Sequence, residues 1–313
     1  MVFTKFIGSN DSCLHCENTR NDHGLVPSIQ LLDSIKFKRM KVEEIEKLIE
    51  ELKSKEYSSD SRENYLEFYG IAKRVLHGDR SIITAPYDSP TLNLFRGRKN
   101  KDGKLFYNFG ELWHPPADVA TMQRFNLKKL PMFYAGTGIS TALIELKPND
   151  EEIYTMINVD LDVPKLRCVQ LAEEQLGDIM ANMDSVKKAA FQYIIDEARK
   201  HVDDNRPQDY YATQIFTQSL RDTAYSSFDA IAYNSVASSL KGYNFAIKPE
   251  FIDAHYIFKS ARVVKIYDYK SREDFKIKCL RKCDRLNSYG RLEYSPVHLC
   301  DGHHISLNNF EHE

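Results

Sequence analysis

The 313-residue sequence lacks long apolar runs, and it lacks an excess of charge of either sign. Nowhere do about 18 apolar residues follow one another, and the amino terminus has no apolar stretch that could form a signal-peptide core. These absences predict a cytoplasmic protein that does not enter a membrane. Lys and Arg total 43 against 45 Asp and Glu, so no global positive field attracts nucleic acid, which would need a local basic patch.

The most common catalytic signatures are also absent. The sequence has no GxxxxGK phosphate loop, no GxGxxG dinucleotide turn, no HExxH zinc-protease motif and no GxSxG hydrolase motif. Trp occurs once, whereas Tyr occurs 18 times and Phe 17 times, and most of these rings are expected to fill cores. With 42% hydrophobic and 28% charged residues, the chain is expected to be soluble and globular, with one large core and a smaller module.

The amino-terminal part of the chain has helical periodicity. Apolar residues recur at helical spacing between positions 40 and 54, and a second helix is expected from about 62 to 76. Turn residues at 85–90 then give way to short β-rich runs, which indicates a domain boundary. We therefore expect a small helical module at 1–88, a main domain at 89–270, and an extension at 271–313 that packs back on the module.

In the main domain, segments with strand and helix patterns follow one another without a regular βαβ order. The predicted strands cover residues 92–95, 132–135, 154–159 and 261–267, and the predicted helices cover 186–201 and 211–220. This irregular order favours an α+β fold over a doubly wound parallel sheet.

The residues that are the best candidates for catalysis or ligand binding lie between Glu111 and Leu146. Arg124, in the run Gln-Arg-Phe-Asn, precedes Tyr134 by ten residues, and Tyr134 precedes Glu145 by eleven. In the RES-domain family, an Arg of a Gly-Arg-aromatic-Asn motif, a strand Tyr and a helix Glu stand at these same intervals. The segment resembles that family.

Other segments extend the resemblance from about residue 92 to 249. The matching segments are Phe95-Arg96, the turn His114-Pro-Pro116, Thr141-Ala142, the helix start Tyr210-Tyr-Ala-Thr-Gln214, the strand Phe228-Asp-Ala-Ile-Ala-Tyr-Asn-Ser235, and the strand Gly242-Tyr-Asn-Phe-Ala-Ile-Lys-Pro249. The sequence departs from the family at Gln123, where Gly is usual, and at Leu127-Lys-Lys129, where a Pro and a Gly are usual.

The resemblance implies an ADP-ribosyltransferase-like split β-sheet core and an enzyme of the toxin or defence-effector type that consumes NAD. Its reaction would be cleavage of the nicotinamide-ribose bond, as a glycohydrolase or a phosphorylase. Transfer of ADP-ribose to a protein is the alternative, and a catalytically dead, zinc-stapled interaction module is the second alternative. Family members are commonly neutralised by a helix-turn-helix antitoxin. The amino-terminal module is another candidate for restraint, and the sequence leaves the oligomeric state, including a homo-oligomer, open.

The chemistry of NAD cleavage assigns roles to the matching residues. The leaving nicotinamide is neutral, so positive charge develops on the ribose, and the carboxylate of Glu145 is the candidate that stabilises it. Arg96 and Arg124 are the candidates for the pyrophosphate, because a planar guanidinium donates two parallel hydrogen bonds. Tyr134 is expected to hold the nicotinamide ring or the ribose.

Two later residues complete the expected NAD site. Ser235 offers a hydroxyl for a ribose oxygen or for the leaving amide, and Asn244 is expected to act chiefly as a brace for the backbone.

Cysteine spacing suggests a structural zinc. Cys13 and Cys16 form a CxxC pair, and Cys300 with His303 has a CxxH spacing near the other end of the chain. Together these four residues would form a tetrahedral site that joins the termini. Alternative ligands are His23, His304 and the pair Cys279 and Cys283, and the other interpretation is that all six cysteines are ordinary thiols.

Replacing Cys16 by Ser is expected to lower the zinc content from about one ion per chain towards zero, because a thiolate ligand is lost. The variant should also become protease-sensitive at both chain ends. Elemental analysis of protein purified without chelator measures the zinc content. Well under one zinc per chain in the unmodified protein would contradict the prediction.

Overall fold

The computed structural model describes residues 40–54, 68–72, 83–84, 91–162, 166–172, 176–202, 206–222, 228–297 and 303–306. All of them belong to one unit of the chain, Ser34–Glu313. Strands and helices are mixed in an irregular order in this unit, so the predicted α+β class is confirmed. No helix in the described ranges is both long and apolar enough to cross a bilayer.

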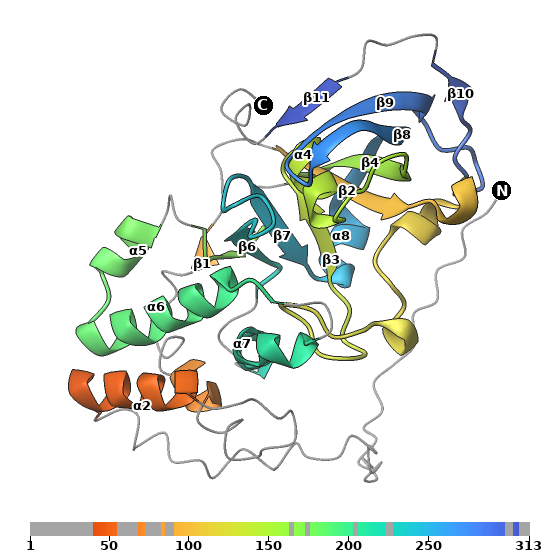
Figure 1. Cartoon of the computed structure of the whole chain (residues 1–313). Helices are drawn as coiled ribbons and strands as arrows, with labels where there is room; N and C mark the ends of the chain where they lie inside the picture. Colours follow the sequence, from red (N-terminus) through yellow and green to blue (C-terminus); the bar gives the residue numbers. More distant parts are fainter. Residues whose placement is uncertain are drawn as a thin grey trace, which may run out of the picture. The chain divides into compact units, whose positions relative to one another are not determined.

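The described strands form one eleven-stranded sheet (Figure 1). They are β1 (Ile83–Thr84), β2 (Thr91–Lys99), β3 (Phe133–Gly136), β4 (Ile153–Asp162), β5 (Cys168–Gln170), β6 (Ala230–Asn234), β7 (Tyr243–Ile247), β8 (Tyr256–Ser271), β9 (Asp274–Cys283), β10 (Ser295–Pro296) and β11 (His303–Ser306). Their order in the sheet is β1-β5-β6-β7-β3-β2-β4-β8-β9-β10, and β11 pairs with β9. β5 and β6 run parallel, and the other pairs among these strands are antiparallel.

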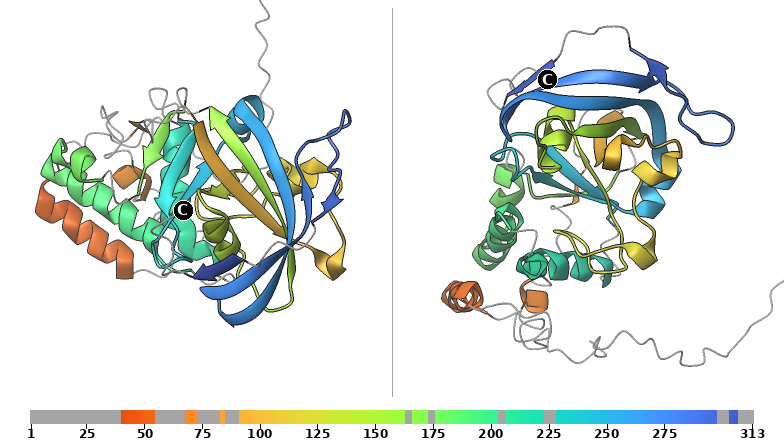
Figure 2. Two further views of the ribbon diagram at one scale, coloured as in Figure 1. Left: turned by 90° about the horizontal axis from the view of Figure 1, so that it is seen from above. Right: turned by 45° about the vertical axis from the view of Figure 1, so that its right-hand side comes forward.

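The sheet continues beyond the part of the chain that the sequence assigns to the main domain. β1 lies before residue 88 and pairs with β5, while β9, β10 and β11 lie after residue 270 and extend the sheet from β8. Long, bent β8 and β9 lie side by side (Figure 2). The pairing of β1 with β5 joins residues more than 80 positions apart, a partnership that local periodicity does not identify.

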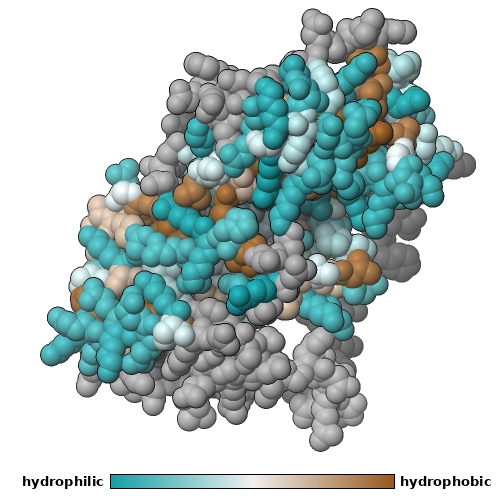
Figure 3. Space-filling model, viewed as in Figure 1, coloured by the Kyte–Doolittle hydropathy of each residue, from teal (hydrophilic) through white to brown (hydrophobic). Residues whose placement is uncertain are grey.

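Helices pack against one another and against the sheet. The described helices are α2 (Val42–Ser54), α4 (Ile139–Glu145), α5 (Leu176–Ala181), α6 (Ser185–Arg199), α7 (Tyr211–Asp222) and α8 (Pro249–His255), with short 3-10 turns between strands. α2 buries Ile45, Ile49 and Leu52 at helical spacing and contacts α6, which in turn contacts α7. The outward side chains over α2 are hydrophilic (Figure 3). Of the second predicted helix, residues 68–72 are described, and they are helical.

The sheet is almost divided between β2 and β3. β2 pairs with β4 along its whole length, from Thr91 opposite Asp162 to Lys99 opposite Tyr154. β2 and β3, in contrast, are joined by the single residue pair Phe95 and Gly136. Beyond that pair the two strands part, which leaves space for side chains and for a pocket.

The side chain of Arg96 replaces the missing strand pairing at this junction. Its Nη1 donates to the carbonyl of Tyr134 at 2.8 Å, its Nε to Leu112 at 3.0 Å, and its Nη2 to Trp113 at 3.3 Å. Burial lowers the pKa of Arg96 to about 10, so the guanidinium still carries its charge at neutral pH. Arg96 therefore ties β3 and the 112–113 turn to β2.

Arg96→Lys is expected to lower the free energy of unfolding by about 3 kcal/mol, because an ammonium cannot reach three diverging carbonyls. Urea unfolding measures this change. The matched control is Arg262→Lys, which alters an exposed Arg on β8 and should stay within about 0.5 kcal/mol of the unmodified protein. Equal stability of the two variants would refute the bridging role.

Candidate functional site

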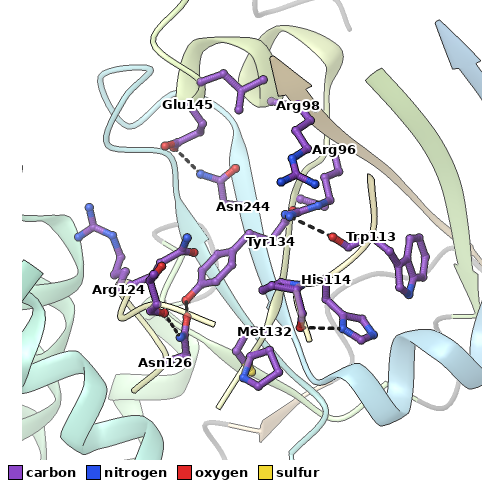
Figure 4. Close-up of a pocket in the computed structure, with 18 of the residues that line it drawn as sticks. Arg96, Arg98, Trp113, His114, Arg124, Asn126, Met132, Tyr134, Glu145 and Asn244 are labelled. Atoms are coloured by element: carbon purple, nitrogen blue, oxygen red, sulfur yellow. Dashed lines mark hydrogen bonds between the residues drawn. The ribbon is translucent and has the colours of Figure 1, made fainter. Parts of the chain in front are cut away.

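A pocket of about 880 Å³ opens where β2 and β3 part (Figure 4). Its walls come from β2, from β3, from α4 and from the long connection between β2 and β3. Five of the six residues predicted for NAD line it, namely Arg96, Arg124, Tyr134, Glu145 and Asn244. Ser235 reaches the same place through a hydrogen bond to Glu145.

The carboxylate of Glu145 is held in one orientation at this pocket. Glu145 is the last residue of α4, and its Oε1 accepts from Ser235 Oγ at 2.7 Å and from Asn244 Nδ2 at 2.6 Å. Ser235 Oγ itself accepts from the backbone N–H of Ser238 at 3.2 Å, so its own proton points towards Glu145. Within the described residues, Oε2 of Glu145 accepts no hydrogen bond, and the side chain is exposed to the pocket.

Close packing of α4 against the sheet fixes where Glu145 lies. A Cβ on Gly242, which has φ +77°, would lie 2.4 Å from Thr141 Oγ1, and a Cβ on Gly136 would lie 3.1 Å from the Thr141 side chain. The two glycines thus allow the helix to approach the ends of β7 and β3. Asn244 on β7 is the cross-strand partner of Gly136 on β3, so its side chain can then reach Glu145.

The hydroxyl of Tyr134 holds the connection that precedes β3. It donates to Asn126 Oδ1 at 2.8 Å and accepts from the backbone N–H of Phe125 at 3.0 Å. Burial raises the pKa of Tyr134, so the phenol stays neutral at physiological pH. The Tyr134 ring faces the pocket, while its hydroxyl acts as a support for the loop (Figure 4).

Arg124 joins the same connection to the helical layer. Its Nη1 donates to the carbonyls of Ala198 at 2.6 Å and Lys200 at 3.0 Å, at the carboxyl end of α6. Its guanidinium also lies over the ring of Tyr210, 4.6 Å from the centroid. A positive group at the carboxyl end of a helix interacts favourably with the helix dipole, so the hydrogen bonds of Arg124 to the end of α6 stabilise both the loop and the helix.

Two residues of the Tyr-x-x-Thr-Gln motif at the start of α7 donate hydrogen bonds to the backbone of this loop. Thr213 Oγ1 donates to the carbonyl of Arg124, and Gln214 Nε2 donates to the carbonyl of Gln123 at 2.9 Å. Because these bonds go to backbone atoms, they do not depend on which side chain stands at position 123.

Two features of the pocket are missing from the sequence-based prediction. Arg98 lines the pocket, and its Nη1 donates to the carbonyl of Glu111. Arg98 follows Arg96 by two residues, so strand alternation could have identified it. The second feature is the support of Trp113 and His114, which line the pocket: Asp253 of α8, outside the lining, accepts from Trp113 Nε1 at 2.6 Å and from His114 Nε2 at 3.0 Å, a contact that no local pattern indicates.

The predicted zinc ligands receive no support from the described residues. Cys13, Cys16, Cys300 and the alternative ligand His23 lie outside them, and His303 begins β11 opposite Ile277. Among the described residues, no group of His, Cys, Asp and Glu could hold a metal ion. The alternative pair Cys279 and Cys283 is wrong: both lie on β9, where four residues span about 13 Å, too far for one ion.

Comparison with models of known protein families finds a match to the central part of the chain. The sequence model of the RES domain family matches residues 83–266, which is more than half of the chain and includes β1 to β8 up to Ile266. A search of curated proteins returned no match.

Lys129→Gly is expected to stabilise the protein by about 0.5 to 1 kcal/mol. Lys129 has φ +65°, a left-handed conformation that costs a residue with a Cβ about 1 kcal/mol, and glycine relieves that cost. Urea unfolding of Lys128→Gly provides the matched control, because this exposed neighbour has no positive φ and should lose stability instead. A loss of stability in both variants would contradict the prediction.

Proposed function

This chain belongs to the RES domain family, whose members are NAD-related, toxin-like domains, and we propose that it cleaves the nicotinamide-ribose bond of NAD. The observation that carries the proposal is the Glu145 carboxylate, which lines the pocket, is oriented by Ser235 and Asn244 through Oε1, and accepts no hydrogen bond at Oε2 within the described residues. A carboxylate fixed before the reaction stabilises developing positive charge without reorganising.

In the proposed reaction, the bond between ribose C1′ and the pyridinium nitrogen breaks, and its electron pair leaves with neutral nicotinamide. Positive charge then spreads over C1′ and the ring oxygen, and Oε2 of Glu145 faces that charge. Water or phosphate forms the new bond to C1′ and releases a proton to solvent. Ser235 and Asn244 act as positioning residues, because each contacts Oε1 and keeps the carboxylate from turning.

For the pyrophosphate we propose Arg124 together with Arg98, with Arg96 in a supporting role. Three N–H donors of Arg96 are already used by backbone carbonyls. Arg98 is exposed at the pocket and has one Nη group on a carbonyl, so other N–H groups remain for a ligand. Arg124 also lines the pocket, although its Nη1 donates to two carbonyls at the end of α6 and its Nη2 donates to the hydroxyl of Tyr210 at 3.4 Å.

Product analysis separates the possible reactions. Purified protein is incubated with NAD, with and without phosphate, and the products are identified by mass. Nicotinamide with ADP-ribose indicates hydrolysis, ADP-ribose 1-phosphate indicates phosphorolysis, and a mass gain on protein indicates ADP-ribosyl transfer. Unchanged NAD under all conditions would contradict the proposal and favour an interaction module.

Glu145→Gln is expected to lower the turnover of NAD by about a hundredfold, because the amide keeps the size of the side chain but removes its charge. Released nicotinamide measures turnover, and calorimetry should show that NAD still binds. Glu250→Gln is the matched control: Glu250 is an exposed residue of α8 outside the pocket, and the variant should turn over NAD at the normal rate. If Glu145→Gln retained normal turnover, the assignment of Glu145 would be wrong.

A further inference from the structure

The connection between β9 and β10, residues 284–294, lies beside the mouth of the pocket. Arg291 forms a β-bridge with Asn108, and the backbone N–H of Leu292 donates to the carbonyl of Tyr107 at 2.9 Å. Asn108 is one of the residues that line the pocket. Figure 2 shows the connection as a dark blue loop that projects from the end of β9. Because paired residues of two segments present their side chains on one face, Arg291 lies next to Asn108 at the rim of the pocket.

One tyrosine projects from the tip of this connection. Tyr289 is 86% exposed, the largest exposed fraction among the large hydrophobic residues that the structure describes. Asn287 fixes the tip: its Oδ1 accepts from the backbone N–H groups of Tyr289 and Arg291, both at 3.0 Å, and its carbonyl accepts from Gly290 at 3.0 Å. Gly290 has φ +69°, which the turn requires. A ring held out on a rigid tip loses little conformational entropy when a ligand covers it.

Two arginines face outward from the arms of the connection. Leu286 pairs with Leu292, and both pack against the core. Because side chains alternate between the two faces of paired segments, the neighbours Arg285 and Arg291 turn to the solvent, and both are exposed. Within the described residues, the side chain of neither arginine makes a hydrogen bond or an ion pair. Their guanidinium groups therefore keep their N–H donors for a partner.

The acidic groups of the connection do not neutralise these arginines. Asp284 forms an ion pair with Lys282 at 3.1 Å, and Glu293 accepts from Asn287 Nδ2 at 3.0 Å. Residues 281–293 hold four Lys and Arg against two Asp and Glu, while the chain as a whole has a net charge of -2. The connection is thus a local basic patch, the feature that binding of nucleic acid requires in a chain without a global positive field.

We propose that the tip surface, defined by Tyr289, Arg285 and Arg291, binds single-stranded nucleic acid, with an unpaired base stacked on the tyrosine ring and neighbouring phosphates on the arginines. One nucleotide combines a flat ring with a phosphate, which matches an exposed ring beside guanidinium groups. A duplex hides the faces of its bases in its own stack, and the carboxylates of an acidic protein would leave the ring uncovered. The surface therefore favours a single strand, and the inference does not depend on cleavage of NAD.

Binding is measured, in the absence of NAD, by the fluorescence anisotropy of a labelled oligothymidylate of about 12 nucleotides, which cannot pair with itself. The unmodified protein should bind it saturably. Tyr289→Ala should lower the affinity about tenfold, because the stacking ring is lost, whereas Tyr289→Phe keeps the ring and should stay within about twofold. Ile257→Ala is the matched control: Ile257 is 55% exposed on β8, outside the connection, and its variant should bind normally.

The salt dependence of the affinity tests the arginines separately. Arg285→Gln and Arg291→Gln should each weaken binding and reduce the slope of log affinity against log salt concentration by about 0.7, the value for one phosphate contact to a single strand. Arg262→Gln, which removes an exposed arginine of β8, is the matched control and should leave the slope unchanged. An equal change of slope in Arg262→Gln would show that the attraction is spread over the surface and would overturn the proposal.

Competition identifies the partner. Unlabelled single strand should displace the labelled strand at about one tenth of the concentration that a duplex of the same length or polyglutamate needs. Equal displacement by the duplex would refute base stacking, and equal displacement by polyglutamate would favour an acidic protein, so either result overturns the proposal. Absence of saturable binding at about 100 mM salt, or unchanged affinity in Tyr289→Ala, overturns it as well.

Discussion

The single residue pair that joins β2 to β3 is the constraint on which the rest of this structure depends. A sheet that stayed fully paired at this point would fill the space with backbone hydrogen bonds and leave no pocket. Because the strands part after Phe95 and Gly136, backbone carbonyls on β3 and on the 112–113 turn need other donors. Arg96 supplies three of them, so the pocket and its support arise from the same break in the sheet.

The position of Glu145 follows from the same region of the sheet. α4 is only seven residues long, and so short a helix has little stability of its own. Its placement comes from Thr141, which packs against Gly136 and Gly242 at the ends of two neighbouring strands. A carboxylate at the end of such a helix, with two donors on one oxygen, is held on the rigid part of the fold, where a reacting group benefits most from fixed geometry.

The sequence indicates which residues line the pocket better than it indicates which contacts their side chains make. The resemblance that rests on the intervals from Arg124 to Tyr134 and from Tyr134 to Glu145 names three side chains that line one pocket in the structure. The hydroxyl of Tyr134 and the guanidinium of Arg96, however, bind backbone atoms, which no residue pattern identifies. Asp253 reaches His114 across 139 residues of sequence, a pairing that only the folded chain creates.

The two departures from the family pattern lie where the loop is held by contacts to its backbone. Gln214 binds the carbonyl of residue 123, so replacing the usual Gly by Gln there leaves the bond intact. At position 129, where a Gly is usual nearby, Lys129 takes a left-handed conformation and its N–H donates to Ala120 at 3.1 Å. The loop thus adopts this conformation at a conformational cost, and the hydrogen bonds of Asn126 and Tyr134 hold it against the strain.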